Sequence, residues 1–317
     1  MWAWKSNIRK SPSLQHVALY FEQEQVSLLA GIKHENKIAV NLIETFSYQP
    51  DTLYTNLLAI VEKHQLRNSP AQLIISDALY ELFSLEPLLV NEDEIHDALR
   101  WKLKDLITYP IDDCCWDYFQ MPSPEFQKQL LYVITTARPW LKTITEKTLA
   151  TGLKIENTSI PALVMKRFIM YPCPEQATTL PHECQESHSL LYEENDKLKL
   201  LILYQNQVYI IRQFDHPVSS FLFNTQMDAS LTEPKFEELA LFLQRSFDYY
   251  QSQLHQMPVS KLFLTVSSPF LLAYLQKNLT CHIETLSVTP WLDEHSPLTS
   301  FQKENFILLA ALLDEEE

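Results

Sequence analysis

The stretch from Phe236 to Ser267 constrains the fold most, because an amphipathic helix leads directly into a buried strand. Apolar side chains recur at steps of three and four and line one helical face: Phe236, Leu239, Leu243, Phe247 and Tyr250. Pro234 suits the first turn of this helix, and Thr232 is available as its cap. Residues 261–266 then read as a strand and 270–279 as another helix. This alternation predicts an α/β fold.

Composition and charge narrow the class of protein. The 317 residues suffice for two ordinary domains or one large one, and 46% of them are hydrophobic, which excludes a disordered chain. The net charge of −15 argues against a general nucleic-acid binder. No apolar run reaches the ~18 residues of a membrane span, and the first residues lack the apolar core of a secretion signal. We therefore expect a cytoplasmic protein.

Cysteines and acidic residues offer two weak metal-site patterns. The odd number of cysteines and the adjacent pair Cys114-Cys115 are a poor disulfide framework, so we expect free thiols. Zinc ligands are conceivable at Cys173, His182, Cys184 and His188, but their spacing matches no standard zinc pattern. The acids Asp112, Asp113 and Asp117 are read as a solvated turn before a strand, and a lone Asp77 as a cap or turn residue. We predict no metal site and no catalytic residue.

Glycine is scarce, and this bears directly on nucleotide binding. The chain has two glycines, Gly31 and Gly152, and neither lies in a glycine-rich loop. Loops that cradle phosphate use glycine for positive φ angles and for close backbone approach. Gly152 instead suits the C-terminal stop of a helix over 139–150.

The order of predicted elements contains a repeat. Three strands (16–21, 26–33 and 37–47), a helix (53–66) and a strand (72–77) open the chain. Three further strands (190–194, 198–204 and 207–214), the helix from 236 and the strand 261–266 repeat this order. Between them we expect a strand over 79–85, a helix over 92–107, a strand around 116–119, a strand over 130–136, the helix 139–150, a strand over 153–158 and a helix over 161–170. A strand over 281–288 and a helix over 301–313 end the chain.

Two segments resemble one protein family. The run Arg245-Ser-Phe-Asp-Tyr-Tyr250 with the strand Leu262 to Thr265, and the segment from Glu92 to Pro122, are similar to the PilM family of type IV pilus assembly proteins. Within it they most resemble the MshI-like chains of MSHA pili, and the cytoplasmic domain of GspL is a related case. The resemblance implies an actin-like fold of two duplicated, ribonuclease-H-like domains. It divides the chain into a disordered tail (1–13), a first domain (14–170) with an inserted lobe at about 79–152, a linker (171–189) and a second domain (190–317).

The resemblance also locates three turns that contact nucleotide in the family. They correspond here to Tyr20 to Glu24, Tyr204 to Gln207 and Ser267 to Pro269, and none contains glycine. We therefore expect a pseudo-ATPase without cofactor, acting as a scaffold for pilus assembly. The alternative is an active ATP-binding actin-like ATPase with divergent phosphate loops.

The implied partner is the N-terminal cytoplasmic segment of a bitopic inner-membrane pilus assembly protein, with the assembly ATPase as a second partner, as for GspL. Such a partner would hold the chain at the inner face of the bacterial inner membrane. We predict that the lobe forms a groove for this segment, with binding residues at Ala98, Trp101, Trp116, Tyr118 and Phe119.

Overall fold

A computed structural model describes residues 14–34, 37–88, 90–121, 130–170, 186–215, 229–265, 268–293, 296 and 303–313. Several predictions concern residues outside these ranges: the tail 1–13, most of the linker 171–189, the zinc candidates Cys173, His182 and Cys184, and Ser267. None of the described helices is long and apolar enough to cross a membrane.

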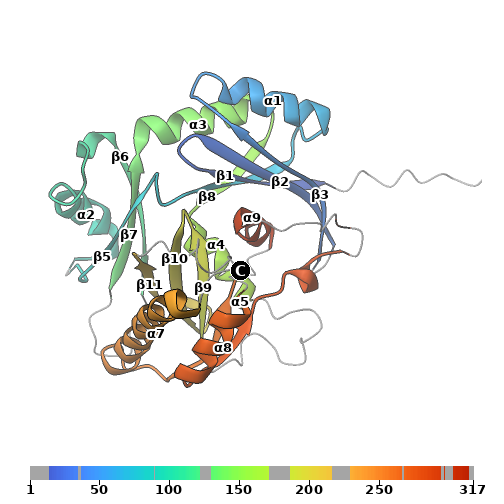
Figure 1. The fold of residues 1–317 in the computed structure, drawn as a ribbon. Helices are drawn as coiled ribbons and strands as arrows, with labels where there is room; N and C mark the ends of the chain where they lie inside the picture. Colours follow the sequence, from blue (N-terminus) through green and yellow to red (C-terminus); the bar gives the residue numbers. More distant parts are fainter. Residues whose placement is uncertain are drawn as a thin grey trace, which may run out of the picture.

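The first sheet has five strands in the order β3-β2-β1-β4-β8. They are β1 (Gln15–Phe21), β2 (Gln25–His34), β3 (Lys37–Ser47), β4 (Pro70–Ile75) and β8 (Lys154–Ser159). Strands β1 to β3 run antiparallel, while β4 pairs parallel with both β1 and β8. Helices α1 (Leu53–Lys63) and α3 (Arg138–Ala150) pack against each other beside this sheet (Figure 1). Helix α1 buries four apolar side chains on one face, as its periodicity predicts: Leu53, Leu57, Ile60 and Val61.

The second sheet repeats the first, with the order β11-β10-β9-β12-β13. Its strands are β9 (Ser187–Glu194), β10 (Lys197–Tyr204), β11 (Gln207–Phe214), β12 (Val259–Leu264) and β13 (His282–Thr285). Helices α7 (Ala229–Ser252) and α8 (Pro269–Asn278) pack beside this sheet, at the bottom of Figure 1. In each sheet an antiparallel three-stranded meander is followed by two parallel strands, so the predicted repeat is confirmed.

Helix α7 begins earlier than its sequence predicts. Pro234 lies inside the helix rather than in its first turn, because α7 already begins at Ala229. Pro234 is the sixth residue of α7 and has no N–H to donate to the carbonyl four residues earlier, so the helix lacks one backbone hydrogen bond there. Pro269, by contrast, stands in the first turn of α8, where Ser268 caps the helix by accepting from the Leu271 N–H.

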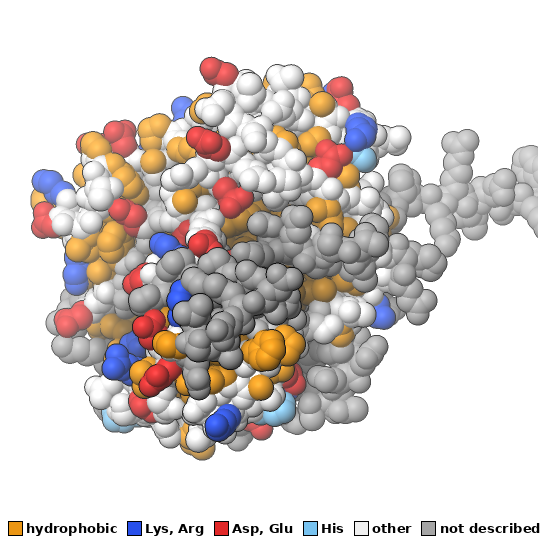
Figure 2. All heavy atoms as spheres, in the orientation of Figure 1, with side chains coloured by type: hydrophobic (Ala, Val, Ile, Leu, Met, Phe, Trp, Pro, Cys, Tyr) orange, Lys and Arg blue, Asp and Glu red, His pale blue; other side chains and the backbone are white. Residues whose placement is uncertain are grey.

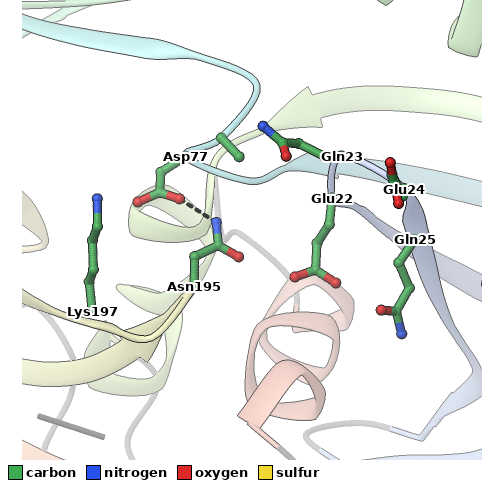
Figure 3. A pocket seen from close by; sticks show the side chains of 8 residues that line it. Glu22, Gln23, Glu24, Gln25, Asp77, Asn195 and Lys197 are labelled. Carbon is green, nitrogen blue, oxygen red and sulfur yellow. Dashed lines mark hydrogen bonds between the residues drawn. The ribbon is translucent and has the colours of Figure 1, made fainter. Parts of the chain in front are cut away.

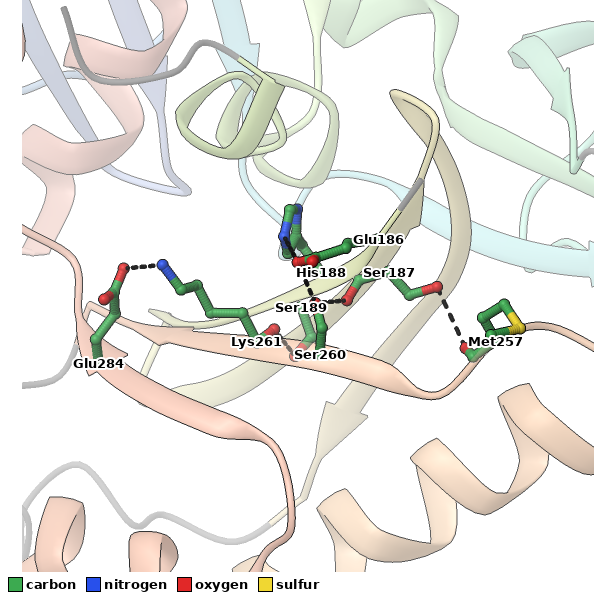
Figure 4. A network of polar contacts seen from close by, with 8 residues as sticks. All are labelled: Glu186, Ser187, His188, Ser189, Met257, Ser260, Lys261 and Glu284. Atoms are coloured by element: carbon green, nitrogen blue, oxygen red, sulfur yellow. Dashed lines mark hydrogen bonds and ion pairs between the residues drawn. The ribbon is translucent and has the colours of Figure 1, made fainter. Parts of the chain in front are cut away.

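Hydrogen bonds and an ion pair link strands of the second sheet to one another and to the segment before β12 (Figure 4). Ser187 Oγ lies 2.8 Å from the Tyr250 hydroxyl and donates to the Met257 carbonyl at 3.3 Å. Lys261 Nζ on β12 forms an ion pair with Glu284 Oε1 on β13 at 3.0 Å. Tyr250, near the end of α7, is thus hydrogen-bonded to Ser187, the first residue of β9.

The inserted lobe has its own three-stranded antiparallel sheet, in the order β5-β7-β6. The strands are β5 (Glu81–Leu85), β6 (Cys114–Gln120) and β7 (Leu131–Ala137). One 3-10 turn (Glu92–Glu94) precedes helix α2 (Ile95–Leu103), and another (Ile111–Asp113) precedes β6. Helix α2 buries Ile95, Leu99 and Leu103 against one face of this sheet. Beyond Ala137 the chain enters α3, which packs on α1. The three-stranded sheet therefore ends at Ala137, whereas the lobe expected from the sequence extends to about residue 152.

The opposite face of the lobe packs on the second sheet. The Tyr132 hydroxyl donates to the Tyr209 carbonyl and accepts from the Ile211 N–H, both at 3.2 Å. Tyr132 therefore occupies the free edge of β11 and joins the lobe to the second half of the chain.

The end of the chain returns to the first half. Helix α9 (Lys303–Leu312) packs against β1, β2 and α4 (Pro161–Met165), at the centre of Figure 1. Its last carbonyls accept hydrogen bonds from the buried guanidinium of Arg167, in α5 (Arg167–Met170). Before α9, a 3-10 turn (Thr289–Trp291) leads to Leu292, which bridges to Ile38 on β3. Residues from the second half thus complete the core of the first.

Candidate functional site

Three loops surround a cavity of about 460 Å³ between the two halves of the molecule (Figure 3). The β1–β2 turn contributes residues 22–25, the segment after β4 contributes Asp77 and Ala78, and the β9–β10 turn contributes Asn195 with the adjacent Lys197. A second cavity of about 310 Å³ shares Asp77 and Lys197 and extends toward β11 and the lobe. The cleft therefore lies at the strand ends of both sheets.

The structure corrects the position of one predicted nucleotide turn. Because β9 takes the place of β1 in the repeated sheet, the counterpart of the β1–β2 turn is the β9–β10 turn. It contains Asn195 and Asp196, whose φ angles of 48° and 60° are those that asparagine and aspartate tolerate best after glycine. The turn at Tyr204 to Gln207 joins β10 to β11 instead. Neither turn contains glycine.

Side chains from the two halves meet across this cleft. Asp77 forms an ion pair with Lys199 Nζ at 2.6 Å, and the two side chains are only 13% and 9% exposed. Asn195 Nδ2 also donates to the Asp77 carboxylate, as Figure 3 shows. The Asp77 N–H donates to Glu194 Oε1 at 2.9 Å. We call Asp77, Glu194, Asn195 and Lys199 the interdomain latch.

The latch makes the cleft a poor environment for additional negative charge. Burial raises the pKa of Glu194 to about 8, although the nearby Lys199 opposes that shift. Burial and the charge of Glu194 raise the pKa of Tyr20, Tyr80 and Tyr192. Glu22 and Glu24 on the β1–β2 turn add two carboxylates to the cavity lining. A phosphate group entering here would meet the Glu22 and Glu24 carboxylates beside Lys197, while Lys199 is already paired with Asp77.

Sequence reasoning missed most of this site. It treated Asp77 as a cap or turn residue, and the structure places it at the centre of the interdomain contact. Glu194 and Lys199 were not singled out, although both are almost fully buried. Lys199 stands between leucines in β10, and because a buried charge needs a partner this was an available signal, whereas Glu194 follows Glu193 at the end of β9 and gave no such signal.

A smaller groove of about 280 Å³ lies between the lobe and the first sheet's layer, and we call it the lobe groove. Thr136 Oγ1 donates to the Leu79 carbonyl at 2.7 Å and fixes the two sides relative to each other. Aromatic, small apolar and hydroxyl side chains dominate the lining. The lining residues are Ala78, Leu79, Tyr80, Glu81, Thr108, Tyr109, Thr136, Ala137 and Trp140.

The five predicted partner-binding residues do not form one surface. At about 100° per residue, Ala98 and Trp101 lie on the flank of α2 opposite His96. His96 contacts Trp116 and Tyr118, with ring centroids 6.4 and 5.6 Å apart. Phe119 points to the other face of the sheet and stacks on Tyr132 with centroids 5.1 Å apart. These residues therefore lie on different surfaces, none of them lines the lobe groove, and their role in partner binding stays a prediction.

Their exposure also differs. Trp101 is 75% exposed, with Lys104 Nζ 6.0 Å from its ring centroid, whereas Trp116 and Tyr118 pack against the small core under α2. The face in Figure 2 shows hydrophobic side chains between charged ones over the lobe. A role for Trp101 in partner binding stays a prediction.

Metal ligation has little support among the described residues, where no three His, Cys, Asp or Glu side chains lie close enough to hold an ion. Asp112 pairs with Arg100 instead. Cys114, Cys115 and Cys281 are free thiols, and Cys114 is buried while Cys115 is partly exposed, as expected for neighbours in a strand.

Comparison with known proteins places the fold. No protein-family model matches the sequence, and no curated protein matches it. Among solved structures, a chain of the PilM-PilN type IV pilus biogenesis complex matches with a TM-score of 0.67 and 15% identity, over 95% of this chain and 98% of that chain. The cytoplasmic domain of EpsL, an inner membrane component of the type II secretion system of Vibrio cholerae, matches with a TM-score of 0.51 and 12% identity, over 95% and 96%.

A protein with an actin-like ATPase fold from Bacteroides thetaiotaomicron also aligns, with 9% identity over 89% of this chain and 93% of that one, at a TM-score of 0.48. The pilus complex chain aligns over 95% of this chain, and the two repeated sheets agree with the duplicated domains that the sequence resemblance implies. The chain therefore has the actin-like fold.

Proposed function

We propose that this chain is a non-catalytic, PilM-like scaffold for assembly of a type IV pilus, of the MSHA kind by its sequence resemblance. It lies in the cytoplasm at the inner face of the inner membrane and does not hydrolyse ATP. The interdomain latch carries the proposal, because protein side chains span the cleft between the β1–β2 and β9–β10 turns, which correspond to two of the nucleotide-contacting turns of the family.

The chemistry of the cleft supports the absence of nucleotide turnover. Backbone N–H groups of glycine-rich turns normally hold phosphate, and here Glu22, Glu24 and Asn195 occupy such turns. Lys199, which lines the second cavity, is neutralised by Asp77 at 2.6 Å, and Lys197 is the lysine that lines the first cavity. Opening this ion pair for a nucleotide would leave Asp77 unpaired next to added phosphate charge.

The lobe groove is the proposed binding site for the partner. Its lining combines apolar walls with hydroxyl groups, which suits an extended peptide with apolar side chains. The similar pilus chain was solved in a complex of PilM and PilN, and EpsL is an inner membrane component. We therefore propose that the partner is the cytoplasmic N-terminal segment of a membrane-anchored assembly protein, with the assembly ATPase as a second partner.

Blocking the lobe groove tests this function. Thr108 is exposed and lines the groove, so Thr108→Trp should fill it without disturbing a core. Thr55→Trp, at an exposed position of α1, is the matched control. We expect peptides from the cytoplasmic segment of the assembly protein to bind wild type and Thr55→Trp alike, and Thr108→Trp at least about tenfold more weakly, a difference of about 1.4 kcal/mol. Equal binding to all three proteins would place the partner elsewhere, and no binding to any would contradict the scaffold.

A further inference from the structure

We propose that Glu81 makes the lobe groove selective for a partner segment with a lysine or arginine, which it binds as a counter-ion inside the groove. The inference rests on the proposed function, since it concerns what the groove binds. The selection is assigned to one positioned carboxylate and not to the overall negative charge of the protein.

The Glu81 carboxylate is held in place by hydroxyl groups from two other elements. Thr108 Oγ1, after α2, donates to Oε1 at 3.2 Å, and Thr135 Oγ1, on β7, lies 3.4 Å from Oε2. The Tyr109 hydroxyl donates in turn to Thr135 Oγ1 at 3.0 Å. The carboxylate therefore has a defined orientation before any ligand arrives, which lowers the entropic cost of binding.

No positive charge within the described residues balances this carboxylate. Glu81 is the one charged residue among those lining the groove, and no described lysine, arginine or histidine lies within ion-pair distance of it. The guanidinium of Arg138, at the start of α3, donates a hydrogen bond to the Cys114 carbonyl instead. A half-buried carboxylate with only neutral hydroxyl partners gains from an added cation.

The walls around Glu81 suit the rest of a long basic side chain. Tyr80, Tyr109 and Trp140 line the same groove. Aromatic faces attract ammonium and guanidinium groups, and they also cover the aliphatic stem of lysine or arginine. An acidic or neutral residue at that place in the peptide would leave the carboxylate unpaired and partly desolvated.

A charge-swap titration tests the proposal. The probes are overlapping fluorescent peptides that cover the cytoplasmic segments of the bitopic pilus assembly proteins of the same cell. Each binding peptide is paired with a copy in which Lys and Arg are replaced by Gln. Against wild type, we expect the Gln copy to bind about tenfold more weakly. Against Glu81→Gln, which keeps an acceptor oxygen for the two threonines, both copies should bind equally and weakly.

Glu86→Gln is the control, because it removes the same charge from an exposed position just after β5. It should retain the full preference for the basic peptide. If binding depends on the groove, as Thr108→Trp reports, but Glu81→Gln keeps the wild-type preference, the role of Glu81 is wrong and the scaffold function stands. If no peptide binds, or Thr108→Trp leaves binding unchanged, the groove function fails and this inference fails with it.

Discussion

At the scale of single residues, the ion pair between Asp77 and Lys199 is a largely buried contact between the two halves of the molecule. Both side chains are almost buried, so removing one partner leaves a charge without compensation. We expect Asp77→Asn to lower the free energy of unfolding by about 3 kcal/mol, and the double variant with Lys199→Met to recover part of that loss. Urea unfolding followed by circular dichroism measures both. A double variant as unstable as the sum of the two single ones would contradict the latch.

Glu194 gives the latch a pH dependence with a definite sign. Its pKa is raised from 4.5 to about 8 by burial, so the folded state binds more protons than the unfolded state between those values. The contribution of Glu194 to stability must therefore fall as pH rises from about 4.5 to about 8. Lys199, Asp77 and Glu22 are the charged groups that face it.

Glu194→Gln removes this titration while an amide oxygen can still accept from the Asp77 N–H. We expect the unfolding free energy of the variant, minus that of wild type, to increase steadily with pH across this window. Chemical unfolding at several pH values measures the difference. A difference that is constant with pH would show that Glu194 does not carry a raised pKa.

At the scale of elements, an exposed side chain on helix α2 and a packed side chain on strand β6 should contribute differently to the stability of the lobe. Trp101 is 75% exposed, so Trp101→Ala should change stability by no more than about 0.5 kcal/mol. Tyr118 packs with His96 in the small core of the lobe, so Tyr118→Ala should cost about 2 kcal/mol or more. Thermal unfolding of the two variants checks this contrast. A strongly destabilised Trp101→Ala would mean that α2 docks differently.

The same elements show what the sequence could and could not predict. The apolar stripe Ile95, Leu99 and Leu103 followed from periodicity, and so did the helix itself. Periodicity does not say which flank of that stripe faces the neighbouring strand, because both flanks are amphipathic edges. Trp101 was therefore grouped with Trp116, although His96 lies on the side toward β6.

The misplaced nucleotide turn has a different cause. Two short polar turns follow each other in the second sheet, after Glu194 and after Tyr204, and both fit a hairpin. The predicted repeat pairs the turn after the first strand of each half, so the turn after Glu194 was available from the sequence. The repeat itself was visible because each copy brings three strands, a helix and a strand in succession.

At the scale of the whole molecule, several contacts among the described residues hold the two halves together. The interdomain latch joins them at the cleft, Tyr132 joins the lobe to β11, and helix α9 from the end of the chain packs on β1, β2 and β4. The run Phe306 to Leu313 is apolar on all sides, and residues 307–313 are buried. A helix without a polar face predicts burial between layers, so this signal was available in the sequence. These contacts, formed by the chain itself, hold the two halves in one arrangement.

Calorimetric titration with Mg-ATP tests directly whether the protein binds nucleotide, with a groove-binding peptide as the positive control in the same buffer. We predict no measurable heat at millimolar nucleotide and no rise in melting temperature, because a ligand that binds the folded state must stabilise it. Asp77→Asn should behave in the same way, since the glycine-free turns remain. A dissociation constant of about 10 μM or tighter, worth roughly 7 kcal/mol, would contradict the account and favour an ATPase with divergent loops.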